Sequence, residues 1–182
     1  MAWSISFDES LRPDAAQAVR SLLGEGIAVT LLSGDSQPRV ARLAERLGLR
    51  QAIDSATPER KLDAMRSAQS HGDIVAMVGD GINDAPALAQ ADVSFAMPQG
   101  AQIARSTADA VLLSGRLSDV VASMQLARRT VRVMRQNLVW AALYNAACVP
   151  LAVVGWLPPW AAGLGMAASS LVVVVNALRL SR

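Results

Sequence analysis

Two carboxylates stand where a short apolar run gives way to a turn, in the stretch Met-Val-Gly-Asp-Gly-Ile-Asn-Asp that begins at Met77. Asp80 comes just past the end of the apolar run, and Asp84 comes four residues later. Gly79 and Gly81 on either side of Asp80 would let the backbone approach a ligand closely. Paired hard oxygen donors suit Mg²⁺, which neutralises phosphate oxygens during phosphoryl transfer. The spacing by itself also fits an ordinary polar turn of an α/β protein.

Two further groups could bind phosphate, each beside the end of a predicted element. Ser33, Gly34 and Asp35 follow another apolar run, so that a hydroxyl and free backbone amides stand at the end of a predicted strand. Lys61 lies in the first turn of a predicted helix that Thr57 would cap. The helix dipole does not stabilise a cation there, so we interpret Lys61 as the partner of a phosphate. A solvated surface lysine is the alternative.

The elements that must position these side chains alternate between apolar runs and helical stretches up to about residue 115. Helices are predicted at residues 13–24, 38–47 and 57–70, and strands at 27–32, 74–78, 93–97 and 110–113. Strands that alternate with helices predict a parallel α/β sheet whose site lies at the carboxyl ends of the strands.

The last third of the chain has a different composition, because no Asp or Glu follows Asp119. Two apolar segments, residues 138–156 and 160–180, approach the ~20 residues that a helix needs to cross a bilayer. Arginines flank the outer ends of the pair, and the short turn between them has none, which places both outer ends in the cytoplasm. A buried helical hairpin of a soluble protein is the alternative.

The net charge of +2 raises the question of nucleic acid as a partner. The basic residues that cluster, Arg128, Arg129, Arg132 and Arg135, lie directly before the first apolar segment, as in a cytoplasmic membrane flank. We therefore expect membrane lipid and no nucleic acid as a partner. Cys148 is the only cysteine, which excludes an intramolecular disulfide.

Side chains that could bind an ion occur inside both apolar segments: Tyr144, Asn145 and Cys148 in the first, and Met166, Ser169, Ser170 and Asn176 in the second. Polar groups inside membrane helices are costly, so they suggest a function. A path for Ca²⁺, Mg²⁺ or Zn²⁺ would be expected to offer carboxylates, whereas thioether and thiolate ligands suit monovalent copper. The alternative is that Met166 fills space, that the serines pack helices together and that Cys148 is a packing residue.

These residues resemble a known family. Ser33, Lys61, Asp80 and Asp84 follow the order found in the haloacid-dehalogenase superfamily. More narrowly, Ser-Gly-Asp, Thr-Pro-Glu-Arg-Lys and Gly-Asp-Gly-Ile-Asn-Asp-Ala-Pro-Ala-Leu closely resemble the phosphorylation domain of P-type ATPases. Tyr-Asn in one apolar segment and Met-x-x-Ser-Ser in the next resemble the copper-selective class of heavy-metal members. Family members more often have Thr-Gly-Asp-Asn where this chain has Ser-Gly-Asp-Ser, and serine keeps the hydroxyl.

The resemblance covers nearly the whole chain and implies its organisation. Residues 1–116 would form part of a haloacid-dehalogenase-like, Rossmann-type parallel sheet, residues 117–137 a cytoplasmic linking helix, and residues 138–182 a transmembrane helical hairpin. By the same match Asp80 and Asp84 would coordinate Mg²⁺ with support from Asn83. Ser33, Gly34, Asp35 and Lys61 would serve the phosphate, and Tyr144, Asn145, Met166 and Ser170 would contact the transported Cu⁺.

The family's phosphorylated aspartate, in the motif Asp-Lys-Thr-Gly-Thr, does not occur in this chain, and neither does its nucleotide domain. We therefore expect the C-terminal part of an ATP-driven copper pump, inactive without the N-terminal portion of the same ATPase, which would bind most of the ATP. The expected location is a bacterial inner (plasma) membrane with the α/β part in the cytoplasm, and a copper chaperone is a candidate partner.

Three alternatives stay open. One is a zinc or cadmium P-type ATPase fragment, which the missing membrane carboxylate disfavours. Another is a membrane-anchored module without catalysis. The third is a soluble phosphatase that uses Asp8, after a possible strand at residues 3–7, as its nucleophile; the apolar segments argue against it.

Overall fold

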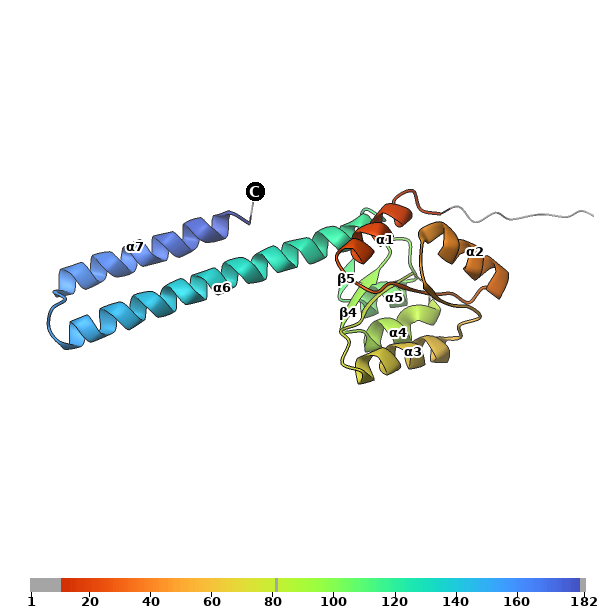
Figure 1. Ribbon diagram of the computed structural model, residues 1–182, viewed down its shortest axis with the longest axis horizontal. Coiled ribbons are helices and arrows are strands. Elements are labelled where there is room, and N and C mark those ends of the chain that lie inside the picture. Colours follow the sequence, from red (N-terminus) through yellow and green to blue (C-terminus); the bar gives the residue numbers. More distant parts are fainter. Residues whose placement is uncertain (1–10, 81, 181–182) are drawn as a thin grey trace, which may run out of the picture. The chain divides into compact units, whose positions relative to one another are not determined.

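The computed structural model describes residues 11–80 and 82–180 in two compact units, Met1–Ala122 and Ser123–Arg182 (Figure 1). The strand predicted at residues 3–7, together with Asp8 and Gly81, lies outside the described residues.

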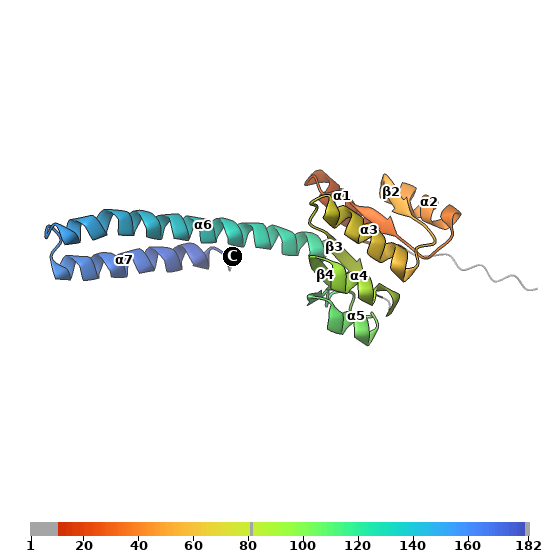
Figure 2. The same ribbon diagram turned by 90° about the horizontal axis from the view of Figure 1, so that it is seen from below.

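The first unit is built from short parallel strands with helices between them, and this confirms the predicted α/β class. Its strands are β1 (Thr30–Leu32), β2 (Gln51–Ile53), β3 (Ala76–Gly79), β4 (Val93–Ala96) and β5 (Ala110–Val111). Its helices are α1 (Ala15–Gly24), α2 (Gln37–Leu47), α3 (Pro58–Ser70), α4 (Ala85–Gln90) and α5 (Gln102–Thr107), with a 3₁₀ turn η1 at Ile82–Asp84. Figures 1 and 2 show these elements along the chain.

The strands form two hydrogen-bonded groups, β1 with β2 and β3 with β4 and β5, and every pairing is parallel. Gly79 at the end of β3 lies opposite Ala96 at the end of β4. Beyond that pair, the amide of Met97 still donates to the carbonyl of Gly79 at 3.1 Å. The carboxyl ends of β3 and β4 therefore meet at one edge, where the sequence analysis expected the site.

Helix ends follow local sequence signals. Thr57 caps α3 by accepting a hydrogen bond from the amide of Arg60 at 3.3 Å, and Pro58 is the first helical residue. Gly48 ends α2 in the left-handed conformation, with φ of 69°. The prediction differs from the structure at β2, α4 and α5, for which it gave no residue ranges, and at the strands, which are shorter than predicted.

The packing that holds the site centres on α4. Ala87 and Leu88 of α4, Ala96 of β4 and Ala104 of α5 are all at most 1% exposed. The three alanines let α4 lie close against β3, β4 and α5, Leu88 fills the space between them, and α3 packs on α4 as well. A second cluster of buried residues, Ala15, Val19 and Leu47, lies between α1 and α2.

Two long helices follow. The predicted linking helix and first apolar segment are one helix, α6 (Ser118–Val153), with Pro150 inside it. In the second unit α7 (Pro159–Leu178) lies beside α6, and Figures 1 and 2 agree on this. Trp140 Nε1 donates to Ser169 Oγ at 3.0 Å, and Asn176 Nδ2 donates to Asn137 Oδ1 at 2.9 Å, so polar contacts join the two helices.

By length and composition, α7 is the one helix of the described residues that could cross a membrane. The span predicted at residues 138–156 is helical as far as Val153, and its crossing of a bilayer stays a prediction. Gly155, with φ of 80°, lies in the turn between the two helices.

Candidate functional site

The carboxyl end of β3 carries the two aspartates that the sequence singled out. Asp80 follows β3 directly, and its side chain is exposed. The 3₁₀ turn η1 brings Asp84 back toward the strand, so that the amide of Asp80 donates to Asp84 Oδ2 at 3.4 Å. Asp84 is buried, with 8% exposure. The turn therefore gives the two carboxylates opposite environments, one open to solvent and one enclosed.

Lys61, the only lysine of the chain, reaches this turn from the first turn of α3. Its Nζ lies 2.6 Å from Asp84 Oδ1, and each of the two side chains is 12% exposed. Such a contact is a charge-assisted hydrogen bond, short and strong for its kind. The structure thus contradicts the alternative of a solvated surface lysine, and the anionic partner that it displays is Asp84.

Two glycines let the backbone around the aspartates close up. A Cβ on Gly79 would lie 2.8 Å from Asp84 Cβ, so only glycine fits between strand and turn. A Cβ on Gly100 would lie 2.9 Å from the carbonyl oxygens of both Asp80 and Met97. The amide of Ala101 also donates to the Asp80 carbonyl at 2.9 Å. The loop after β4 therefore clamps the backbone of Asp80.

Ser33, Gly34 and Asp35 follow β1, as predicted, and make their own turn. The Ser33 hydroxyl accepts from the amide of Asp35 at 3.2 Å and lies 3.3 Å from Asp35 Oδ2. The Ser33 amide donates to Ile53 and its carbonyl accepts from Ala56, so β2 and the segment after it fix the turn. Among the described residues no hydrogen bond joins this turn to Asp80, Asp84 or Lys61.

The four predicted contacts of the transported ion lie in the second unit. Tyr144 faces α7, because its hydroxyl is 2.6 Å from the place that a Cβ on Gly165 would take. Met166 is 67% exposed, and Asn145 and Ser170 are exposed as well. No hydrogen bond joins any two of these four in the part of the chain that the structure describes. Ser169, by contrast, is bonded to Trp140, which supports its interpretation as a packing residue.

Comparison with known proteins identifies the fold that carries this site. The model of the haloacid dehalogenase-like hydrolase family matches residues 2–92, which is half of the chain. The chain belongs to this family.

Among haloacid dehalogenase-like proteins, the chain is similar to heavy-metal P-type ATPases over nearly its whole length, which confirms the predicted resemblance. It is 42% identical over 174 residues to the "Probable copper-exporting P-type ATPase V" of Mycobacterium tuberculosis, covering 96% of this chain and 23% of that protein. It is 43% identical over 183 residues to the "Probable copper-transporting ATPase PacS" of Synechococcus elongatus, covering 97% and 24%. The crystal structure of a zinc-transporting PIB-type ATPase in its E2.Pi state superposes with a TM-score of 0.89, at 37% identity, covering 96% of this chain and 28% of that one. The chain therefore spans about a quarter of the length of these relatives.

The donor set of this haloacid dehalogenase-like site suits Mg²⁺ in kind. Mg²⁺ is usually held by one or two carboxylates together with waters and substrate phosphates. The exposed carboxylate of Asp80 fits that role, whereas both oxygens of Asp84 are already engaged, by Lys61 and by the amide of Asp80. Asn83 is exposed beside them. No group of three or more His, Cys, Asp or Glu side chains that could hold a metal occurs among residues 11–80 and 82–180.

Sequence reasoning missed Gly100. The sequence Pro98-Gln99-Gly100 predicts a turn, because proline and glycine favour turns. This prediction is correct, but the sequence signal for it is weak. That the turn presses on Asp80 depends on the pairing of β3 with β4, which no local pattern reveals.

Proposed function

We propose that the chain is the C-terminal part of an ATP-driven pump that moves monovalent copper across a membrane through an aspartyl-phosphate. The observation that carries this proposal is the enclosed Lys61–Asp84 pair next to the exposed Asp80, in a chain 42% identical to a copper-exporting relative. Lys61 supplies a cation and Asp80 an open carboxylate at the carboxyl end of a parallel strand, where phosphate chemistry occurs in such sheets. The absence of any Asp or Glu after Asp119 favours copper over harder ions.

Each residue then has a physical task at the phosphate. Asp80 would hold Mg²⁺, which supplies neutralisation of the charge on the transferred phosphoryl group. Asp84 holds Lys61 in place and fixes the amide of Asp80, so its own task is positioning. Lys61 would balance phosphate charge, and the Ser33–Asp35 turn would offer a hydroxyl and amides to the phosphate oxygens.

Two strand edges could pair with the motif that the chain lacks. Among the described strands, β1 and β3 each keep one edge without a hydrogen-bonded neighbour. A parallel strand between them would bring its carboxyl end close to both Ser33 and Asp80. We assign that place to a strand that would carry the motif Asp-Lys-Thr-Gly-Thr, which the resemblance to P-type ATPases implies.

The membrane part would supply only a share of the copper path. Asn145, Met166 and Ser170 are exposed on α6 and α7, as expected of residues that other helices of a pump would cover. Tyr144 would join them as a fourth contact. The proposed setting is a bacterial plasma membrane with the α/β unit in the cytoplasm, lipid around α7, and a copper chaperone as the donor of the ion.

A zinc pump is the second candidate, and one observation favours it: the TM-score of 0.89 to a zinc-transporting relative. The lack of a carboxylate in residues 120–182 argues against it.

The test is a chimera in which this chain replaces the matching segment of the Mycobacterium tuberculosis copper-exporting relative. We expect Cu⁺, and not Zn²⁺, to stimulate ATP hydrolysis and formation of the aspartyl-phosphate. Asp80→Asn should abolish Mg²⁺-dependent phosphorylation, and Asp73→Asn, at an exposed position outside the site, should not. Stimulation by Zn²⁺ alone would support the second candidate, and a folded chimera that never becomes phosphorylated would support a non-catalytic module.

A further inference from the structure

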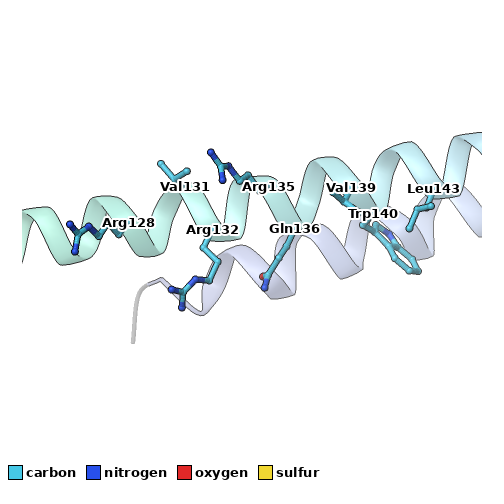
Figure 3. Close-up of a pocket in the computed structure, with 8 residues that line it drawn as sticks. All are labelled: Arg128, Val131, Arg132, Arg135, Gln136, Val139, Trp140 and Leu143. Atoms are coloured by element: carbon cyan, nitrogen blue, oxygen red, sulfur yellow. The ribbon is translucent and has the colours of Figure 1, made fainter. Parts of the chain in front are cut away.

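One face of α6 in the second unit is hollowed into an open groove of about 560 Å³. The residues that line the groove are basic toward one end and apolar toward the other, as Figure 3 shows. Arg128, Arg132 and Arg135 lie at one end, and Val139, Trp140 and Leu143 lie at the other. A ligand that fills this groove must therefore be anionic at one end and apolar at the other.

The contact of α6 with α7 fixes where the groove would lie in a bilayer. Asn176, two residues before the end of the candidate span at Leu178, donates to Asn137 of α6. Asn137 is thus level with the edge of the hydrocarbon region, and at about 1.5 Å per residue Arg132 lies about 8 Å farther out. At the same rise Arg135 lies about 3 Å out, inside the headgroup layer, which is roughly 5–7 Å thick on each side of the hydrocarbon. Arg132 starts just beyond that layer, and its long side chain can reach back into it. Val139 and Leu143 continue inward, to the depth of the acyl chains.

The charges of Arg132 and Arg135 are not matched by acidic residues in the same stretch of sequence. Residues 120–182 contain no acidic side chain, so no carboxylate of this stretch is available to pair with Arg132 or Arg135. Arg132 and Arg135 are exposed. Guanidinium groups bind phosphate in a forked, bidentate geometry, which suits a phosphate ester better than a diffuse anion.

We propose that this groove is a binding site for one anionic phospholipid. Its phosphate lies between Arg132 and its arginine neighbours, and an acyl chain follows Val139 and Leu143 past the ring of Trp140. The apolar half distinguishes this ligand from free phosphate, and the arginine half distinguishes it from a neutral lipid. The proposal rests on the membrane setting proposed above and not on copper transport.

The test uses the full 182-residue chain in nanodiscs, with Trp140 as the reporter. Brominated phosphatidylglycerol or brominated phosphatidylcholine is added in increasing proportion to unlabelled phosphatidylcholine, and the quenching of tryptophan fluorescence is measured. The part of the quenching that is absent from Trp140→Phe belongs to Trp140. We expect phosphatidylglycerol to quench at much lower mole fraction than phosphatidylcholine. Each arginine near an anionic membrane surface contributes roughly fivefold in affinity, so Arg132→Gln should lower the preference about fivefold and Arg132→Gln with Arg135→Gln about 25-fold.

Arg129 supplies the matched control, since it carries the same charge on the same helix and does not line the groove. Arg129→Gln should change the preference less than twofold, and Arg132→Lys should lose part of it although the charge remains. Circular dichroism checks that each variant is as helical as the parent chain.

Equal losses in Arg129→Gln and Arg132→Gln would overturn the proposal in favour of diffuse surface charge. Competition by soluble glycerol phosphate as effective as by the lipid would overturn it in favour of a free phosphate site. An absence of Trp140 quenching by either lipid would overturn it in favour of a groove covered by protein, a second copy or another segment.

Discussion

Lys61 and Asp84 carry opposite charges 2.6 Å apart, with 12% of each side chain exposed. Removing one member of so shielded a pair leaves the other charge without a partner in a poorly solvated place. We expect Lys61→Met to lower the free energy of unfolding of the first unit by about 3 kcal/mol, measured by pulse proteolysis in urea. Adding Asp84→Asn should recover part of that loss, because the amide is neutral. Equal losses in the single and the double variant would show that packing, and not charge, is responsible.

Gly100 lies close against the backbone of Asp80, although the two residues are far apart in the sequence. A methyl group there would lie 2.9 Å from two backbone carbonyl oxygens, which cannot move aside as the end of a flexible side chain can. We expect Gly100→Ala to destabilise the first unit by roughly 1–3 kcal/mol, seen as a lower thermal midpoint by circular dichroism. Gly24→Ala is the control, because no atom lies within 4 Å of the Cβ it would add. Similar midpoints for the two variants would refute the clamp on Asp80.

At the scale of elements, the sequence predicted what local signals specify. The cap at Thr57 and the left-handed Gly48 were predictable because each depends on neighbours in the chain. Strand β2 was not predictable, since it has three residues, two of them exposed, and exists by pairing with β1. The predicted strands were too long for the same reason. A strand ends where its hydrogen bonding to a neighbouring strand ends, and not where an apolar run ends.

The candidate site divides in the same way. The types of Asp80, Asp84 and Lys61 and their places at element ends follow from the sequence. That Lys61 contacts Asp84 does not, because the contact joins residues 23 apart and needs α3 and η1 to pack against each other. The dipole argument correctly required an anion near Lys61, and could not choose between a phosphate and a carboxylate.

A contact between β4 and the residue before β5 should make the stability of the first unit depend on pH. Asp109, just before β5, accepts hydrogen bonds from the hydroxyl and the amide of Ser94, each at 2.8 Å. These bonds lower the pKa of Asp109 below its ordinary value of 3.8. A carboxyl group whose pKa is lower in the folded state stabilises the fold above its unfolded pKa, and the effect is lost as pH falls through the folded pKa.

We therefore expect the thermal midpoint of the first unit to fall between pH 6 and pH values below 3.8, and to fall less in Asp109→Asn, which cannot titrate. Ser94→Ala should also reduce the fall, because it removes one of the donors. The measurement is thermal unfolding by circular dichroism across that range of pH. An identical acid sensitivity in parent and Asp109→Asn would refute this role of Asp109.

At the scale of the whole molecule, α6 is the helix whose residues fall in both units. Its beginning is tied to the first unit by residues more than 100 positions earlier. The amide of Ser118 donates to Asp14 Oδ2 at 2.8 Å, and Arg12 Nη1 donates to the carbonyl of Gly115 at 2.8 Å. Leu117 packs against the buried cluster that contains Ala15 and Val19. The start of α6 must therefore follow any movement of α1.

In a pump, such a connection would transmit events at the phosphate to the helices that hold the ion. Asp14 acts as an N-cap supplied from another element, and losing a cap typically costs about 1 kcal/mol, or roughly fivefold in the population of the ordered end. In the chimera, we expect Asp14→Ala to leave Mg²⁺-dependent phosphorylation within twofold of the parent, and to lower Cu⁺ transported per ATP hydrolysed by up to about fivefold. Phosphorylation and the ratio of Cu⁺ transported to ATP hydrolysed can be measured on one preparation of proteoliposomes. The control is Asp73→Ala, which removes an exposed carboxylate elsewhere in the first unit. An unchanged ratio of transport to hydrolysis would mean that the Asp14–Ser118 contact stabilises the fold and does not couple the two units.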